Sequence, residues 1–224
     1  MNKVAAIQMC SSAQIEDNLA VAATLIQESA ENGANLVVLP EMFPVIGLHS
    51  VNTLLAKEEM GHGKIQSFLS QQAKKHNIWI VGGTIPIACE NKNQIKAACL
   101  VLNNQGSFVA RYDKIHLFDA YISDNETYQE SFTTISGNKL VVIDTLLGKL
   151  GLTVCYDIRF PELYRYLINC GAQIITTSAF TLKTGQAHWE ILARSRAIEN
   201  SCYISSVLAK VATIPMAEIL MVIH

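Results

Sequence analysis

Cys155 stands where a reactive thiol is useful, at the end of an apolar run and the start of a polar turn. The run Gly-Leu-Thr-Val-Cys-Tyr-Asp-Ile-Arg-Phe-Pro-Glu-Leu covers residues 151–163 and leads into a helix that begins near Pro161. A bend of this kind exposes the sulfur, directs backbone N–H groups at a substrate and places a helix N-terminus nearby, and these conditions turn a thiol into a nucleophile. A lone cysteine is more often a buried structural residue, so the interpretation depends on what accompanies it.

Two further charged residues follow predicted strands: Glu41 follows a short β-rich run, and Lys114 follows the second strand of a hairpin. Loops at the carboxyl ends of strands are where α/β folds gather their chemistry. Together the residues predict covalent catalysis, in which Cys155 attacks an electrophilic carbon to form a thioester. Glu41 takes the thiol proton, passes it to the departing amine and activates the hydrolytic water. Lys114 and the backbone N–H of Tyr156 stabilise the oxyanion. Taken singly, Glu41 fits an exposed loop carboxylate and Lys114 a solvated surface charge.

Composition limits the class of protein that can carry these residues. In 224 residues, 50% are hydrophobic and 16% are charged, which favours one large α/β domain with parallel strands buried on both faces. A net charge of −2 without a basic cluster predicts no nucleic-acid partner. No apolar run is long enough for a membrane span, and the segment 4–9 is too short for a secretory signal. The six cysteines form no CxxC pair, which predicts reduced thiols in a cytoplasmic protein.

The elements that would position these residues alternate along the chain in the order of a layered α/β protein. Residues 117–138 are expected to form a long polar, functional loop. We expect strands over 4–10, 35–39, 78–83, 97–102, 107–112, 141–144, 150–155 and 174–177, and helices over 11–32, 63–76, 161–168 and 186–200.

The residues around the three candidates resemble motifs of the nitrilase, or carbon–nitrogen hydrolase, superfamily. The segments are Leu-Pro-Glu-Met-Phe (39–43), Arg-Tyr-Asp-Lys-Ile-His-Leu-Phe-Asp (111–119) and Cys-Tyr-Asp-Ile-Arg-Phe-Pro-Glu-Leu-Tyr-Arg (155–165), in the order of the family. The resemblance extends from about Lys3 to Lys210. It implies an αββα sandwich, a homodimer if the C-terminus were complete, and catalysis with neither a metal ion nor an organic cofactor.

The resemblance also assigns roles to single residues. It implies a Glu-Lys-Cys triad of Glu41, Lys114 and Cys155, with a second glutamate, Glu130, supporting the lysine. A second carboxylate beside Lys114 would keep its amine protonated and oriented. Glu130 lies in a polar stretch, however, and is also compatible with a plain surface position.

Within the superfamily, three later segments look like the Nit branch, namely Ser-Ala-Phe-Thr (178–181), Thr-Gly-Gln-Ala-His-Trp-Glu (184–190) and Arg-Ala-Ile-Glu-Asn (196–200). That branch includes amidases that hydrolyse deaminated glutathione and related ω-amides, so the expected substrate is a small linear amide carrying a carboxylate, cleaved with release of ammonia. Phe180 and Thr181 are expected to line the pocket. Arg159 either binds a substrate carboxylate bidentately or forms a structural ion pair. His188 and Trp189 are interpreted as packing residues at the start of a helix.

Other functions fit the same residues. Within the superfamily the alternative is an N-carbamoyl-amine or nitrile hydrolase. An alternative from another functional class is that the chain is an inactive remnant or a non-catalytic interaction module. A redox sensor would need a resolving thiol, for which Cys170 is the candidate. A Ser-His-Asp hydrolase is not supported, because the Gly-x-Ser-x-Gly elbow is missing from the sequence.

After Lys210 the resemblance stops, so residues 1–210 are expected to form an incomplete hydrolase domain and residues 211–224 a non-homologous tail. Residues 211–224 can be back-translated into codons and then read in a shifted frame, in which the third base of each codon is joined to the first two bases of the next. The peptides that this shifted frame can encode include Gly-x-His-x-Asn-Gly-Arg-Asn-Thr-Tyr-Gly-His-Ser. This string is similar to a C-terminal motif of the family. We therefore expect that a frameshift near codon 211 produced the tail and that a sheet edge is left uncovered. A natural shorter variant is the alternative.

Overall fold

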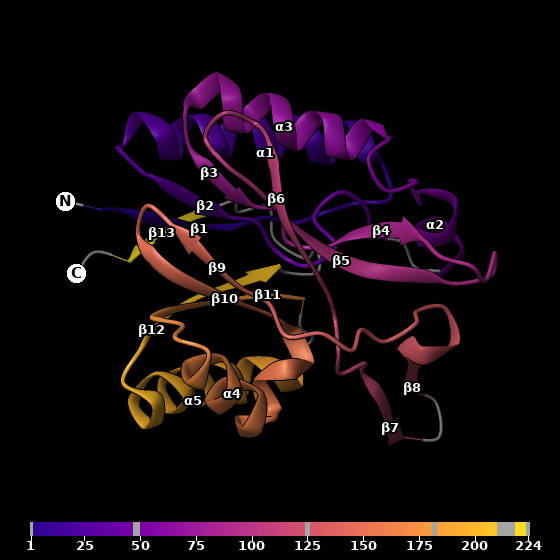
Figure 1. Cartoon of the computed structure of the whole chain (residues 1–224). Helices are drawn as coiled ribbons and strands as arrows, with labels where there is room; N and C mark the ends of the chain where they lie inside the picture. The colour runs from indigo at the N-terminus through magenta and orange to yellow at the C-terminus, as the bar shows by residue number, and fades with distance from the viewer. Residues whose placement is uncertain (1, 47–49, 124–125, 181–182, 210–217, 223–224) are drawn as a thin grey trace.

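Two β-sheets stack face to face, and each carries helices on its outer face, as Figure 1 shows for the computed structural model. The structure describes residues 2–46, 50–123, 126–180, 183–209 and 218–222. This four-layer arrangement is the αββα sandwich that the family resemblance implied, and it agrees with the layered α/β order predicted from the sequence. None of the helices in these ranges combines the length and the hydrophobicity that crossing a bilayer requires.

The larger sheet carries the first half of the chain, with strands in the order β13-β1-β2-β3-β5-β4 and β6 paired to β5. Its central strands β1, β2 and β3 are parallel to one another. The helices α1 and α3 cover its outer face, because each presents apolar side chains at helical spacing to the sheet. The elements are β1 (Val4–Gln8), α1 (Ile15–Glu31), β2 (Leu36–Val38), α2 (Ser50–Leu55), α3 (Lys64–His76), β3 (Trp79–Val81), β4 (Ile85–Ala88), β5 (Ile95–Leu102), β6 (Phe108–Asp113) and β13 (Glu218–Val222).

The smaller sheet has the order β12-β11-β10-β9, with β10, β11 and β12 parallel. Its inner face packs against the larger sheet through a shared apolar layer that includes Leu36, Val38, Leu152 and Val154. Two helices cover its outer face through a separate cluster. The elements are β9 (Val142–Thr145), β10 (Gly148–Val154), η2 (Cys155–Arg159), α4 (Pro161–Asn169), β11 (Ile174–Phe180), α5 (Lys183–Asn200) and β12 (Tyr203–Ala209).

The predicted long loop over residues 117–138 is wrong. This stretch forms a two-stranded sheet of β7 (Asp119–Ser123) and β8 (Glu126–Gln129), followed by a 3-10 turn η1 (Glu130–Phe132). Polar composition concealed it, because hairpin strands outside the sandwich need no apolar alternation. The strand predicted over 150–155 also ends one residue early, since Cys155 already belongs to η2.

The C-terminal tail contributes a strand. β13 pairs antiparallel with β1, with Val4 opposite Val222 and Gln8 opposite Glu218. An edge of the larger sheet is therefore occupied by part of residues 211–224, where the sequence led us to expect an uncovered edge. The run Glu-Ile-Leu-Met-Val is apolar enough to serve as a strand.

Candidate active site

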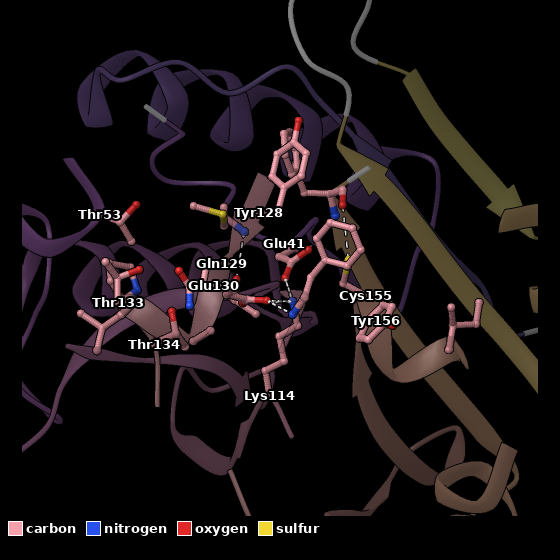
Figure 2. Close-up of a pocket in the computed structure, with 18 of the residues that line it drawn as sticks. Glu41, Thr53, Lys114, Tyr128, Gln129, Glu130, Thr133, Thr134, Cys155 and Tyr156 are labelled. Atoms are coloured by element: carbon pink, nitrogen blue, oxygen red, sulfur yellow. Dashed lines mark hydrogen bonds and ion pairs between the residues drawn. The ribbon is translucent and has the colours of Figure 1, made fainter. Parts of the chain in front are cut away.

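Three strand ends bring Glu41, Lys114 and Cys155 to one cavity. Glu41 follows β2, Lys114 follows β6 and Cys155 follows β10, so both sheets contribute. The cavity has a volume of about 350 Å³, and all three side chains line it. Figure 2 shows the side chains pointing toward one another, with the Lys114 amine between Glu41 and Glu130. Residues more than 110 positions apart in the chain thus share one site.

Lys114 is buried between two carboxylates. Its Nζ lies 2.8 Å from Oε1 of Glu41 and 2.8 and 3.0 Å from the two carboxylate oxygens of Glu130. Burial by itself would lower the pKa of the amine, but the negative charges of Glu41 and Glu130 raise the pKa well above its usual value. Lys114 is therefore a permanent cation at the centre of the site.

The turn after β2 fixes Glu41 against both sheets. Its Oε2 accepts the backbone N–H of Phe180 at the end of β11, at 2.8 Å. Met42, the next residue, has a positive φ of 54° and donates its N–H to the hydroxyl of Thr84. Behind the turn, a Cβ on Gly83 would lie 1.9 Å from the carbonyl oxygen of Pro40. Only glycine at this position lets the Glu41 turn approach so closely.

Cys155 adopts a backbone conformation that is rare for a residue with a side chain, with φ of 48°. Such strain persists only where the surroundings enforce it, and it is concentrated at functional sites. Its Sγ donates to the carbonyl oxygen of Phe180 at 3.3 Å. Burial, followed by the charge of Glu41 and a hydrogen bond to it, raises the pKa of the thiol well above its usual value, although Lys114 opposes this. The resting group is consequently a thiol that needs a base.

Asp157 is a positioning residue that the sequence interpretation missed. It is fully buried, and its carboxylate accepts the Tyr112 hydroxyl at 2.6 Å and the Val154 N–H at 2.8 Å. It also accepts the backbone N–H and the Nδ1–H of His116, at 3.0 and 2.7 Å. The carboxylate thereby joins the Lys114 segment to the Cys155 turn. The available signal was spacing, since Tyr112 and His116 lie two residues on either side of Lys114.

Glu130 reaches Lys114 from outside the sandwich. It begins η1, directly after β8, and its Oε2 also accepts the backbone N–H of Phe118 at 2.7 Å. Burial raises the pKa of its carboxyl group, although the attraction of Lys114 works in the opposite direction. The structure thus places Glu130 beside the lysine rather than on a plain surface.

The other expected pocket residues are distributed around the cysteine. Tyr156, Arg159 and Phe180 line the cavity, whereas Thr181 lies outside the described residues. The Arg159 guanidinium lies 5.9 Å from the centre of the Tyr156 ring, and its Nη2 is 3.3 Å from Nδ1 of His188. It forms no ion pair with a described residue, so the structural ion pair considered for it is not observed.

His188 and Trp189 also line the cavity, and Trp189 packs in the apolar cluster beneath the outer helices, which agrees with its interpretation as a packing residue. The helix α5 begins at Lys183 rather than at 186, which places both residues inside it. Within the described ranges, no group of three or more His, Cys, Asp or Glu side chains is arranged to hold a metal ion.

Comparison with known proteins identifies the family. Residues 3–213 match the carbon-nitrogen hydrolase family model. The chain belongs to this family. It is 42% identical over 204 residues to the deaminated glutathione amidase of Yersinia enterocolitica, covering 90% of this chain and 71% of that protein. It is 37% identical over 205 residues to the omega-amidase NIT2 of Mus musculus, covering 91% and 73%.

Solved structures agree with the sequence relatives. The crystal structure of Saccharomyces cerevisiae Nit3, a member of branch 10 of the nitrilase superfamily, superposes with a TM-score of 0.82 at 32% identity, over 93% of this chain and 75% of that chain. The C. elegans NitFhit protein superposes with a TM-score of 0.84 at 34% identity, over 93% and 51%. This carbon–nitrogen hydrolase is accordingly an amidase of the nitrilase superfamily, as the sequence motifs indicated.

Proposed function

We propose that this amidase works through a thioester on Cys155, with Glu41 as general base and acid and Lys114 as the oxyanion cation. The observation that supports this most strongly is the position of Glu41, which lines the same cavity as Cys155, pairs with the Lys114 ammonium at 2.8 Å and accepts the N–H of Phe180, the residue whose carbonyl oxygen accepts the Cys155 thiol. A thiol with a raised pKa is a poor nucleophile unless a neighbouring base removes its proton as it attacks. Glu41 is the carboxylate in position to do so.

In the first half of the reaction, the Cys155 sulfur bonds to the amide carbonyl carbon while Glu41 takes the thiol proton. The negative charge that develops on the carbonyl oxygen is stabilised by Lys114 and the backbone N–H of Tyr156. One such donor is typically worth about 3 kcal/mol in the transition state. Glu41 then returns the proton to the nitrogen, the C–N bond breaks, and ammonia leaves from a primary amide.

In the second half, water replaces the departed ammonia. Glu41 takes a proton from the water as its oxygen bonds to the thioester carbon, and a second tetrahedral oxyanion forms against the same donors. When the C–S bond breaks, the sulfur recovers the proton from Glu41 and the free acid is released. Glu130 stays paired with Lys114 throughout, which keeps the ammonium oriented.

The proposed substrate is a small linear amide that carries a carboxylate. Arg159 provides a cation on the turn that carries Cys155 and forms no ion pair with a described residue, and a guanidinium suits bidentate binding of a carboxylate. Phe180 and Tyr156 supply the adjoining wall, and we assign Thr181 to the same wall. Deaminated glutathione and primary ω-amides are the first compounds to test, because relatives at 42% and 37% identity carry those names.

Intact-mass spectrometry of the protein mixed with each amide tests the proposal. We expect a transient acyl adduct on the wild type, loss of that adduct in Cys155→Ala, and the acid as product. If no amide gives an adduct in a sample with native circular dichroism, the triad assignment fails and an inactive remnant is supported. An adduct from nitriles or N-carbamoyl amines alone would instead favour the alternative hydrolases.

We further propose a cytoplasmic homodimer. All six cysteines are free, which suits a reducing compartment. Exposed apolar side chains lie on the outer helices, Tyr166 on α4 and Ile191 and Ile198 on α5, and exposed apolar side chains of this kind suit a two-fold contact. Light scattering on the wild type and on Ile198→Glu tests the dimer, since the charge should yield monomers.

For residues 211–224 we propose an out-of-frame origin. The family match reaches residue 213, and the shifted reading of the following codons permits the Gly-x-His motif. The nucleotide sequence around codon 211 decides this, because a gene without that motif in the shifted frame would contradict the idea.

A further inference from the structure

The side chain of Arg159 is exposed, but the backbone that carries it is firmly held. On one side, the carbonyl oxygen of Ile158 accepts the Nε–H of the buried Arg196 at 2.9 Å. On the other side, the N–H of Phe160 donates to the carbonyl oxygen of Asp157 at 3.0 Å. The backbone of Arg159 is therefore fixed, and only contacts of its side chain can fix the guanidinium.

Two neutral groups hold that guanidinium. The centre of the Tyr156 ring lies 5.9 Å from its Cζ, and Nδ1 of His188 lies 3.3 Å from its Nη2. A guanidinium can only donate hydrogen bonds, so Nδ1 must be the acceptor and the imidazole carries its proton on Nε2. Both contacts orient the cation, and neither cancels its charge.

Arg159 differs in this respect from the other arginines of the chain. Each of those pairs with a carboxylate: Arg111 with Asp113, Arg165 and Arg196 with Glu199, and Arg194 with Glu190. Arg159 has no carboxylate partner in the part of the chain that the structure describes, and it lines the active cavity. A cation that is oriented without being neutralised is available to an anion that enters the cavity.

The helix α5 sets the direction of the His188 side chain. Trp189, the next residue, is 9% exposed and packs in the apolar cluster beneath the outer helices. Leu192, one turn after His188, packs against the same cluster and lines the cavity together with His188. The packing of the helix therefore directs the imidazole toward the cavity and toward Arg159.

We propose that His188 is a positioning residue, which holds the Arg159 guanidinium in the orientation that binds the carboxylate of the substrate. The inference rests on the proposed function, in which Arg159 binds that carboxylate, and it makes His188 a determinant of the preference for amides that carry one. An arginine side chain loses rotational freedom when it binds an anion. A guanidinium that His188 and Tyr156 already restrain loses less of it, so the carboxylate binds more tightly. The contact with His188 uses one N–H of Nη2 and leaves the remaining donors for a bidentate pair.

Two amides of similar length test the inference: glutaramic acid, which carries a carboxylate, and pentanamide, in which a methyl group replaces it. We expect the wild-type kcat/KM to be higher for glutaramic acid. His188→Leu should raise the KM for glutaramic acid about fivefold, the usual effect of losing one hydrogen bond, with kcat nearly unchanged. The kinetic constants for pentanamide should stay the same, because this substrate brings no anion to Arg159.

Two matched variants separate the hydrogen bond from other effects of the substitution. His188→Asn places an amide oxygen near the position of Nδ1 and should restore most of the preference for glutaramic acid. His62→Leu makes the leucine substitution at an exposed histidine that does not line the cavity, and it should change the kinetics of neither substrate. A loss in His188→Asn as large as that in His188→Leu would show that the hydrogen bond to Arg159 is not the cause, and the inference would fail.

A double-mutant cycle shows whether His188 acts through Arg159. Arg159→Gln should remove most of the preference for glutaramic acid by itself, and adding His188→Leu should then change the preference little. A further fivefold loss in the double variant would mean that His188 acts on the substrate directly, which overturns the positioning role.

The remaining outcomes separate the inference from the proposed function. An unchanged preference in His188→Leu, with native circular dichroism, overturns the inference and leaves the triad intact. If His188→Leu does not fold, His188→Phe, which keeps a ring without an acceptor, gives the same comparison. If the wild type does not hydrolyse pentanamide, the inhibition constants of pentanamide and glutarate replace the two KM values. An unchanged preference in Arg159→Gln overturns the role of Arg159 together with the inference, but not the triad. Failure of the wild type on glutaramic acid, and on the wider amide set, overturns the proposed function itself.

Discussion

The two walls of the active cavity are built differently. The Cys155 wall belongs to the sandwich, where the turn after β10 is secured by Asp157, a fully buried carboxylate with four hydrogen bonds. The Glu130 wall is positioned by the β7–β8 hairpin, which Figure 1 shows beside the two stacked sheets rather than within them. There the Glu130 side chain is 22% exposed.

This difference indicates a division of tasks. The nucleophile and its base must be held within a fraction of an ångström, and only closely packed elements provide such precision. An electrostatic partner acts over a longer distance and tolerates a looser support. We therefore expect the effects of substitution to decline from the residues anchored in the sandwich to those anchored in the hairpin.

Replacing the general base should give the largest effect. In Glu41→Gln, no group can take the thiol proton, and we expect kcat/KM to fall about a thousandfold. The glutamine keeps the shape of the side chain, so circular dichroism and the melting temperature should change little. Amide hydrolysis followed by product chromatography measures the loss.

The same variant should make the Cys155 thiol ionise more easily while it slows amide hydrolysis. Glu41 is one of the causes that raise the pKa of Cys155, so removing its charge should lower that pKa. Alkylation of Cys155 by iodoacetamide, followed from pH 6 to 10, should then reach its half-maximal rate at a lower pH in Glu41→Gln than in the wild type. A parallel fall of hydrolysis and alkylation would contradict the assignment of Glu41 as the base.

Asp157→Asn should give the second-largest loss of activity, because Asp157 holds the Cys155 wall, which is the better anchored of the two. An asparagine has one acceptor oxygen, so either the Tyr112 and Val154 donors or the two His116 donors must face its NH2 group. Leaving buried donors unpaired should lower the free energy of unfolding by about 3 kcal/mol and kcat by roughly 10- to 100-fold. Urea unfolding and steady-state kinetics measure the two changes.

Asp144→Asn is the matched control. Asp144 lies on β9 with its side chain 86% exposed and makes only a loose contact with Lys149. Its replacement should change neither stability nor rate measurably. If Asp157→Asn were equally silent, the two walls would not differ in the way described.

The sequence predicts much of this arrangement, but particular elements and residues could not be predicted from it, for physical reasons. Buried parallel strands are apolar and end in polar turns, so Glu41, Lys114 and Cys155 can be recognised where those runs stop. β4 escaped prediction because Pro86 interrupts a four-residue run that forms only by pairing with β5. Thr133 and Thr134 escaped because no local pattern distinguishes a threonine facing a cavity from one facing solvent.

Glu130→Gln tests the looser wall and should cost less, about tenfold in kcat. Lys114 keeps Glu41 as its partner, and the glutamine retains an acceptor for the Phe118 N–H. Glu130→Gln should therefore fold normally. A loss as large as that of Glu41→Gln would show that the hairpin carries a direct chemical step, which contradicts the division of tasks.

The pH profile sharpens the same comparison. Because the pKa of Glu130 is raised, on acidification the folded protein takes up this proton at a higher pH than an ordinary glutamate would. Below that pKa Lys114 loses one ionic partner, so the fall of wild-type kcat/KM at acidic pH should include a contribution from protonation of Glu130. This contribution should be missing from the pH profile of Glu130→Gln. The folded state binds this proton more tightly than the unfolded chain. Stability from this group is therefore present at low pH and declines as pH rises through the raised pKa.

Phe118→Leu should give the smallest effect, because it loosens the connection between the walls without removing a polar group. The Phe118 ring lies 5.2 Å from that of Tyr156 on the sandwich wall and 5.7 Å from that of Tyr128 on the hairpin. Each aromatic pair is worth about 1 kcal/mol, while the backbone N–H that holds Glu130 is retained. We expect KM to rise about threefold with kcat nearly unchanged, since the hairpin still supports Lys114 but closes the cavity less firmly. A large fall in kcat would instead mean that the rings, rather than the backbone hydrogen bond, keep Glu130 on the lysine.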